Sequence, residues 1–380
     1  MALTTERHYF PQSTAGYLVP MFTGLLSAFS SAMILNIIRA SPDKLSTTYH
    51  RIMASMSVFD FIASICIALV TFPMPSDNAI EFSGPMLGNH LTCQIQGYLI
   101  TFGMGGGSSL YMCLSWYFVL SISFKMNSYT IKRRVEPIMF VYALFIAFFT
   151  PSYFLSKDMI HSDSRAPYCT IAIDSQDQSD CFDSSCEGNN INHEQDDGVA
   201  IWVGINLALI VIAMMIILWT IHKNNKSIMI ALEEENMNAV DEDQESSREE
   251  NIQSNSKFVA RLRQSRSSMV QALMYILAYF ITWFFLLLRH INAQYYMDVA
   301  VAILFPLQGF WNMIIFVYDK ADLVYQTERC NSWCDAIKTV MLSPGNIPSI
   351  VIDLQMVIDD DTSQVSNEHF TISVNNEVSE

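Results

Sequence analysis

Long apolar stretches alternate with polar connections along this chain. Seven stretches hold almost no charged side chain, and each is about 20 residues long, the length at which a helix crosses the hydrocarbon layer of a bilayer. A helix satisfies its own backbone hydrogen bonds, which lipid cannot do. The pattern therefore predicts an all-α integral membrane protein, a bundle of seven transmembrane helices. The predicted spans are Tyr17–Ile38, Ile52–Phe72, Gln96–Ser123, Val135–Leu155, Val199–Ile221, Met269–Leu288 and Val299–Tyr318.

Positive charges predict which way the bundle faces, because the cytoplasmic loops of membrane proteins carry the excess of Lys and Arg. Of the 21 Lys and Arg residues, 17 lie after the first, third, fifth or last span. We therefore expect an extracellular N-terminus and a cytoplasmic C-terminus. The segments are then a short extracellular N-terminus (1–16), a transmembrane domain (17–318) with an outer loop (156–198) and a cytoplasmic insert (223–268), a juxtamembrane amphipathic segment (319–340) and an acidic disordered cytoplasmic tail (341–380).

The net charge of −16 comes mostly from the outer loop, a cytoplasmic run at 233–250 and the tail. Such blocks of like charge are usually solvated and disordered, so we do not read them as cation sites. No nucleotide-binding Gly loop, HExxH motif or Ser/His/Asp constellation is present. The sequence therefore predicts neither an enzyme nor a nucleic-acid-binding protein, and no structural metal site.

Four cysteines fall on the predicted outer side, where disulfides persist. Cys93 lies at the mouth of the third span and Cys169 in the long outer loop, and a bridge between them would pin that loop over the bundle. Cys181 and Cys186 would then close a small loop of their own. Four cysteines allow three pairings, so this arrangement is a preference.

Two further cysteines, Cys330 and Cys334, follow the last span on the cytoplasmic side. Reversible palmitoylation is one reading of juxtamembrane cysteines, and free reduced thiols are the other.

Asp60 is the only acid in the middle of a predicted span. A carboxylate in the bilayer is unfavourable unless it is paired, hydrated or protonated, so a functional role is the first hypothesis. It would bind water or a Na⁺ ion with Asn312 as partner, or else be a neutral structural residue. Pro151 and Pro306 are each expected to kink their helix.

These features together resemble the rhodopsin-like G-protein-coupled receptors, and more closely their slime-mould cyclic-AMP-receptor-like branch, over roughly residues 15–330. The most specific string is Pro-Leu-Gln-Gly-Phe-Trp-Asn at 306–312, which is similar to the PLQGFxN segment of that branch. Asp60 matches the family's second-helix Asp and Trp283 its sixth-helix toggle Trp. Cys93 and Cys169 match its outer disulfide.

Several family positions differ in this chain. The Asp-Arg-Tyr motif falls at Tyr117-Phe118-Val119, so the arginine of the usual ionic lock is absent. Met313 and Phe316 replace the Pro and Tyr of the NPxxY motif that starts at Asn312.

Two further positions reduce the classes of ligand that the chain is expected to bind. Ile100 lies where amine receptors place an Asp, which disfavours a biogenic amine, and the seventh span has no Lys to carry retinal. A small molecule or short peptide would bind between the third, fifth, sixth and seventh helices beneath the Cys169 loop. We expect Trp283, Tyr279 and Thr170 to line this pocket.

The resemblance implies a heterotrimeric G protein as the inner partner of a plasma-membrane receptor. The contacts are expected at Tyr117, Phe118, Lys125, Arg261, Arg263 and Arg266. Attraction to anionic lipid headgroups, at about 1 kcal/mol per charge, is the alternative explanation of the basic residues. The alternative function is a seven-helix transporter, although transporters usually show internal repeats and several midplane charges, which this chain lacks.

Overall fold

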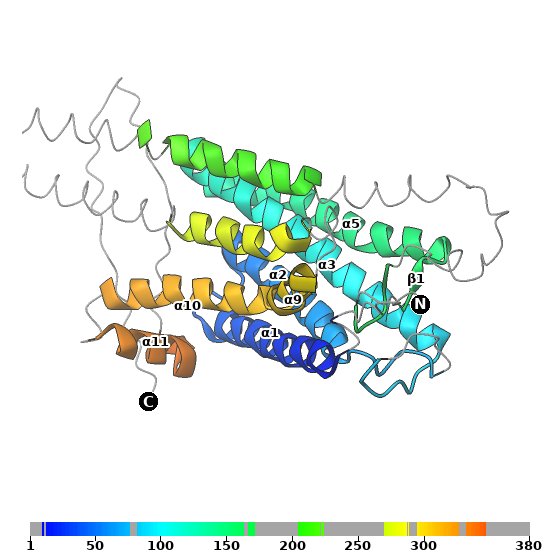
Figure 1. Ribbon diagram of the computed structural model, residues 1–380. Helices are drawn as coiled ribbons and strands as arrows, with labels where there is room; N and C mark the ends of the chain where they lie inside the picture. The colour runs from blue at the N-terminus through cyan, green and yellow to red at the C-terminus, as the bar shows by residue number, and fades with distance from the viewer. Residues whose placement is uncertain are drawn as a thin grey trace, which may run out of the picture.

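The computed structural model describes residues 10, 13–76, 82–162, 166–171, 204–220, 222–223, 270–286, 288, 295–326 and 332–346. Over these residues the protein is mostly helical, and the long helices run side by side as a bundle (Figure 1). Three helical stretches are long and apolar enough to cross a membrane, and a fourth qualifies if a bent pair is counted as one span. The chain is therefore a helical membrane protein by the length and composition of its helices, and its described part holds three to four qualifying spans, whereas the sequence predicted seven in the whole chain.

The first three helices begin at polar caps. α1 (Thr14–Ala40) starts after Ser13, whose side chain accepts a hydrogen bond from the Gly16 amide. α2 (Thr48–Ala68) starts after Thr47, and α3 (His90–Phe118) starts at a capping box formed by Asn89 and Thr92. Such caps satisfy backbone N–H groups that have no partner inside the helix. α3 then continues as a π-helical turn, η2 (Val119–Ser123).

The middle of the chain adds three more helical stretches. α4 (Ser128–Thr130), η3 (Ile131–Val135) and α5 (Glu136–Ser156) form one continuous stretch that qualifies as a span, and Pro151 lies inside α5 without interrupting it. Two shorter apolar helices follow, Gly204–Thr220 and Val270–Leu286. In Figure 1 these are the bright green helix at the top and the yellow helix below it.

The predicted seventh span is broken in two. α9 (Tyr295–Leu304) and α10 (Gln308–Gln326) meet at an angle of 49°. Pro306 lies in the three-residue turn between them, so the kink expected there is confirmed.

The end of α10 corrects the sequence prediction of the juxtamembrane segment. α10 runs to Gln326 because its buried stripe of Val317, Ala321 and Val324 continues past the predicted boundary. The separate amphipathic helix is α11 (Trp333–Leu342), which packs on α10. A 3₁₀ turn, η4 (Pro344–Asn346), follows it. Regular structure therefore continues past residue 341, where the sequence predicted that the disordered tail begins.

One short hairpin was not foreseen by the all-α prediction. β1 (Ile160–His161) pairs with β2 (Thr170–Ile171) in antiparallel register, and both strands pack on α3. The hairpin lies at the end of the bundle opposite α11 (Figure 1).

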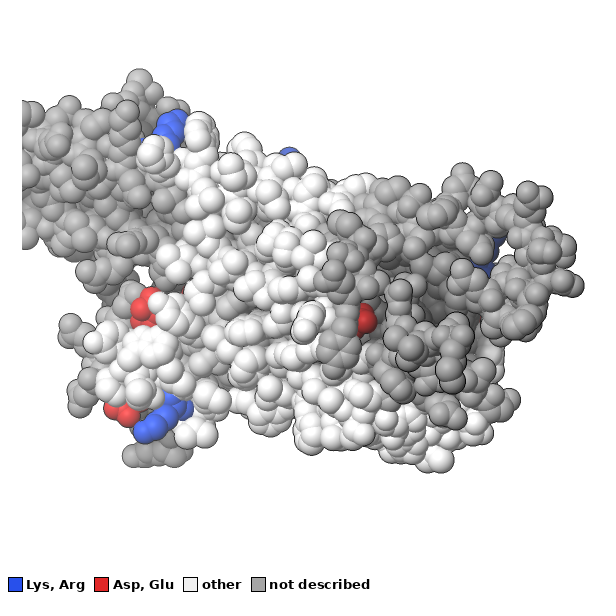
Figure 2. Space-filling view, viewed as in Figure 1, with Lys and Arg blue, Asp and Glu red and all other residues white. Residues whose placement is uncertain are grey.

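The outer surface of the bundle is apolar. Large side chains such as Phe29 (64 % exposed), Ile138 (70 %) and Trp219 (65 %) point away from the core. Figure 2 shows a broad uncharged area across the helices on the face in view. A soluble monomer rarely exposes such a large contiguous apolar surface, whereas lipid covers one.

Candidate functional site

Three buried polar side chains meet inside the bundle, one each from α2, α3 and α10. The Asn312 Nδ2 donates a hydrogen bond to Asp60 Oδ2 at 2.7 Å, and the Tyr111 hydroxyl donates one to Asn312 Oδ1. Each of the three is at most 6 % exposed. Asn312 is the partner that the sequence suggested for Asp60. Asp60, Tyr111 and Asn312 are called the polar hub below.

Small side chains make room for the polar hub. A Cβ atom on Gly107 of α3 would lie 3.2 Å from Asp60 Oδ1, so a larger residue there would crowd the carboxylate. A cavity of about 20 Å³ adjoins Asp60, which is room for about one water molecule or small ion. It is lined by Asp60, Ala63, Ser64, Ile67, Met104, Phe305, Pro306 and Gln308.

A column of aromatic rings leads from the polar hub to α9. The Tyr111 ring centroid lies 5.0 Å from that of Tyr279, and Tyr279 stacks on Trp283 at 5.5 Å. Trp283 in turn meets Phe305 edge-on at 5.7 Å, at the first residue of the turn that contains Pro306. Tyr279 and Trp283 are four residues apart and so share one face of their helix. Tyr111, Tyr279, Trp283 and Phe305 are called the aromatic column below.

The predicted ligand residues do not line one open pocket. Tyr279 (0 % exposed) and Trp283 (2 %) are enclosed by the bundle, where Trp283 packs against Phe305. Thr170 is half-buried in β2, which packs on α3. A cavity of about 360 Å³ lies elsewhere, between the ends of α2 and α3 beside Gln96, and apolar side chains form most of its wall.

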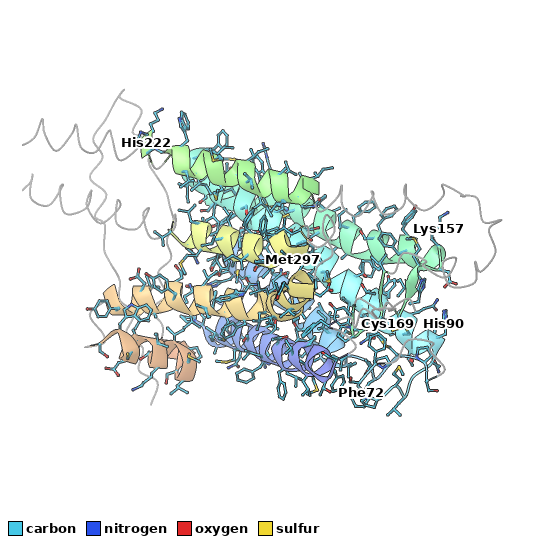
Figure 3. The ribbon with its side chains drawn as sticks, viewed as in Figure 1. Phe72, His90, Lys157, Cys169, His222 and Met297 are labelled. Atoms are coloured by element: carbon cyan, nitrogen blue, oxygen red, sulfur yellow. A yellow bond between two sulfur atoms is a disulfide. The ribbon has the colours of Figure 1, made fainter. Side chains whose placement is uncertain are left out.

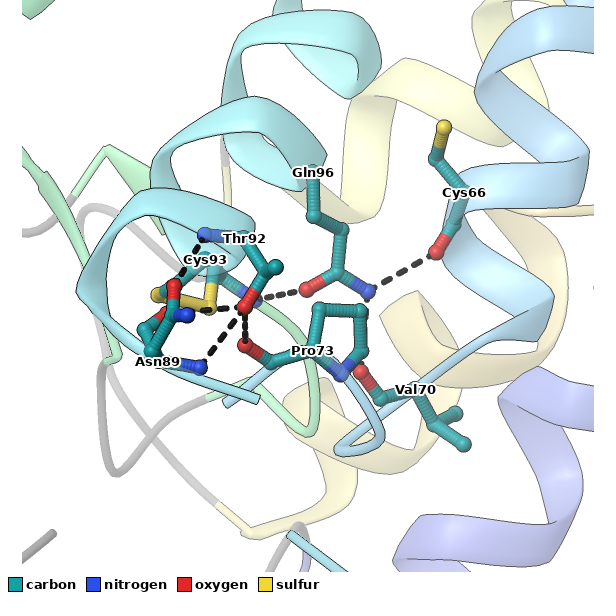
Figure 4. The surroundings of a disulfide bond; sticks show 8 residues. Cys66, Val70, Pro73, Asn89, Thr92, Cys93 and Gln96 are labelled. Carbon is teal, nitrogen blue, oxygen red and sulfur yellow. Dashed lines mark hydrogen bonds between the residues drawn. A yellow bond between two sulfur atoms is a disulfide. The ribbon is translucent and has the colours of Figure 1, made fainter. Parts of the chain in front are cut away.

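At the hairpin end of the bundle, Cys93 and Cys169 form a disulfide with a Cα–Cα distance of 5.4 Å, so this pair of the preferred arrangement is confirmed. The Gln96 side chain supports it (Figure 4). Its Oε1 accepts from the Cys169 amide at 3.0 Å, and its Nε2 donates to the Cys66 and Val70 carbonyls at 2.9 and 2.8 Å. The sequence interpretation missed Gln96. Its signal was a polar residue one helical turn after Cys93.

The other end of the bundle carries the predicted G-protein face. Tyr117 is half-buried and Lys125 is exposed. Phe118 corrects the prediction, because it follows the buried Leu114 by one turn and lies in the core at 5 % exposure.

In the loop between α1 and α2, burial raises the pKa of Asp43 above its usual value, and Lys320 of α10 partly offsets this.

Some predicted residues lie outside the described part of the chain. Cys334 is an exposed free thiol at the start of α11. The residues that lie outside the described ranges are Cys181, Cys186, Arg261, Arg263, Arg266 and Cys330.

Sequence reasoning also missed an ion pair between α2 and α5. The Arg51 guanidinium binds both carboxylate oxygens of Glu136, with Nε–Oε1 at 2.5 Å and Nη2–Oε2 at 2.6 Å. The Thr48 hydroxyl donates to Glu136 Oε2 at 2.7 Å. A bidentate pair of this kind fixes geometry as well as charge. In the sequence, this ion pair was indicated by an acid, Glu136, at the first position of an apolar helix.

A second missed acid is Asp298, near the start of α9. It is 8 % exposed, in a helix whose last residue, Leu304, directly precedes Phe305.

Side chains fill the space between the helices along the whole bundle, from Cys169 and His90 at one end to His222 at the other (Figure 3).

No family model matches the chain, and no curated protein matches it. Function is therefore inferred from the polar hub and the aromatic column.

Proposed function

We propose that this chain is a cell-surface G-protein-coupled receptor. It has seven membrane-spanning helices with the N-terminus outside, and it passes an extracellular small-molecule or short-peptide signal to a heterotrimeric G protein. The observation that carries the proposal is the continuous contact from Trp283 through Tyr279 and Tyr111 to Asn312 and Asp60. One buried path thus joins α2, α3, α10 and the helix Val270–Leu286.

This path suits a protein that changes between two helix arrangements. A ligand shifts such an equilibrium only when it binds one arrangement better than the other. The turn at Pro306 lies beside Phe305, so a ligand that moves α9 also moves the ring against Trp283. Trp283 is then the residue through which α9 and the helix Val270–Leu286 change together.

The ends of the bundle support the proposed orientation. Disulfides persist in oxidising compartments, and Cys93–Cys169 lies at the end opposite α11 (Figure 1). α3 has 29 residues and so is about 43 Å long, which matches the thickness of a bilayer with its headgroups, and it is a further proposed span. With the shorter apolar helices Gly204–Thr220 and Val270–Leu286, this adds three proposed spans to the four that qualify among the described residues.

The test is nucleotide exchange on a panel of Gα subunits, with the chain in membranes and a pool of small metabolites and short peptides. Wild type is compared with Asp60→Asn and Trp283→Ala, and Trp219→Ala is the matched control because Trp219 is 65 % exposed on the apolar surface. We expect exchange that both site variants change about fivefold or more, as is typical of a coupling free energy between sites, and that the control leaves unchanged.

The opposite result is equally defined. Surface-expressed protein that drives exchange on no Gα subunit contradicts the proposal. Solute flux that is lost in Asp60→Asn would then assign the chain to the transporters.

A further inference from the structure

A second polar cluster, separate from the polar hub, joins α2 to the helix Val270–Leu286 at the α11 end of the bundle. The Tyr49 and Tyr275 hydroxyls lie 3.0 Å apart, and the Gln271 Nε2 donates to the Tyr49 hydroxyl at 2.6 Å. Tyr275 and Gln271 are 2 % and 7 % exposed. A single hydroxyl on α2 thus holds two side chains from successive turns of another helix.

The Tyr49 ring is fixed on its other sides by aromatic packing. It stacks on Phe316 of α10 with ring centroids 6.3 Å apart, and it meets Phe118 of α3 at 6.2 Å. The Gln271 side chain also interacts with the Asp319 carboxylate of α10. Four helices therefore converge on Tyr49.

Phe118 links this cluster to the position of the ionic lock in rhodopsin-like receptors. Phe118 stands where the resemblance to rhodopsin-like receptors places the arginine of the ionic lock, so α3 offers no charge there. Its ring instead buttresses Tyr49, which holds the helix Val270–Leu286 by hydrogen bonds between neutral groups.

We propose that Tyr49, Gln271 and Tyr275 form a neutral latch that closes the inner end of the helix Val270–Leu286 against α2. The contacts of the latch do not depend on the proposed receptor function. Its role does rest on that function, and the role is to keep the G-protein side of the bundle closed in the absence of ligand. Opening requires the helix to leave Tyr49, and Gln271 and Tyr275 then lose a partner at the same moment. The latch therefore releases as one unit.

The test is the distance between spin labels at Val270→Cys and Phe124→Cys, measured on the full chain in lipid nanodiscs. Both positions are exposed, at 41 % and 62 %, so labels there leave the core unchanged. The background replaces the remaining accessible or undescribed cysteines with Ser, namely Cys181, Cys186, Cys330 and Cys334.

Tyr49→Phe is the sharpest variant, because it removes the hydroxyl and keeps the ring on Phe118 and Phe316. Gln271→Leu is the second variant. Tyr98→Phe is the matched control, since it removes a tyrosine hydroxyl that bonds Ser152 Oγ at 3.2 Å at the far end of the bundle.

We expect a longer distance whose population, relative to the closed distance, rises about fivefold in Gln271→Leu, the ratio expected for one lost neutral hydrogen bond, and further in Tyr49→Phe, which loses two. Tyr98→Phe should match wild type. An unchanged distance distribution in both latch variants overturns the latch, whatever the exchange assay gives. Shifted distances without exchange on any Gα subunit support the latch and overturn the receptor function.

Discussion

At the scale of single residues, the buried carboxylate of Asp60 is the group that most needs polar partners inside the bundle. Asn312 satisfies Oδ2, whereas Oδ1 faces Gly107, and Asp60 also lines a small cavity together with Phe305 and Gln308. A carboxylate in a bilayer needs partners for both oxygens, so we expect a water molecule or a Na⁺ ion in this cavity to supply the second. Asp60 is thus expected to bind a small ligand as well as to join helices.

Sodium should stabilise the protein through Asp60. A ligand at ten times its dissociation constant adds about 1.4 kcal/mol to the stability of the folded state. Wild type in detergent should therefore melt higher in NaCl than in choline chloride, by about 2–4 °C per kcal/mol. Asp60→Asn, which keeps the size of the side chain, should melt at the same temperature in both salts. An equal Na⁺ effect in the variant would rule Asp60 out as the sodium site.

The sequence could identify residues whose chemical type is unusual for their place. Asp60 stands out as an acid within an apolar run, and Asn312 and Trp283 lie in recognisable strings. Gln96 and Tyr49 do not stand out, because their roles depend on partners 73 and 226 residues away. Such residues become functional candidates only when packing brings distant helices together.

At the scale of helices, close approach depends on where small residues lie. A Cβ atom on Gly309 of α10 would lie 2.3 Å from Ser31 Oγ and 3.0 Å from the Ser27 carbonyl oxygen, both on α1. The Gly309 amide also donates to Ser27 Oγ at 3.1 Å. Small residues let helices pack closely in membranes, so this glycine fixes α10 against α1.

Gly309→Val should therefore weaken the α1–α10 contact. Overpacking a close contact is unfavourable by about 1–3 kcal/mol, which lowers the melting temperature in detergent by several degrees. Gly204→Val is the control, because a Cβ atom on Gly204 meets nothing within 4 Å. Equal melting temperatures for the two variants would contradict the packing.

The ion pair between Arg51 and Glu136 should stabilise the contact between α2 and α5. Loss of either partner leaves a buried charged group without its hydrogen bonds, at about 1–3 kcal/mol. Arg51→Ala and Glu136→Ala should each lower the melting temperature, and the double variant should lose less than the sum of the two. Strict additivity in this double-mutant cycle would show that the two side chains act independently.

Helix ends were less predictable than helix centres. The apolar run stops at Tyr318, but α10 continues to Gln326 because helical hydrogen bonding does not end where hydropathy does. α3 begins at the Asn89 capping box, six residues before its predicted start. Caps and buried stripes fix these boundaries, and neither is visible in a hydropathy pattern.

At the scale of the whole molecule, apolar patterning alone predicts a helical membrane protein. Hydropathy is a property of each segment, so it reports the helices and leaves their mutual arrangement open. The contacts that join the ends of the bundle are instead between side chains distant in sequence. They are the Gln96 support of the disulfide, the aromatic column, the polar hub and the latch around Tyr49.

The proposed orientation predicts which surface residues reagents can reach in intact cells. Leu87 (75 % exposed) lies at the disulfide end and Lys125 (exposed) follows η2 at the other end. A membrane-impermeant maleimide should label Leu87→Cys in intact cells, and Lys125→Cys only after permeabilisation. The reverse pattern would place the disulfide end in the cytoplasm and invert the topology.

The most direct test of the central claim is a double-mutant cycle on nucleotide exchange, with Trp283→Ala and Tyr111→Phe. Tyr111→Phe removes only the hydroxyl that bonds Asn312 and keeps the ring on Tyr279. If the aromatic column and the polar hub work as one unit, the two changes should be non-additive by about 0.5–3 kcal/mol. Additive effects, or no exchange on any Gα subunit, would contradict it.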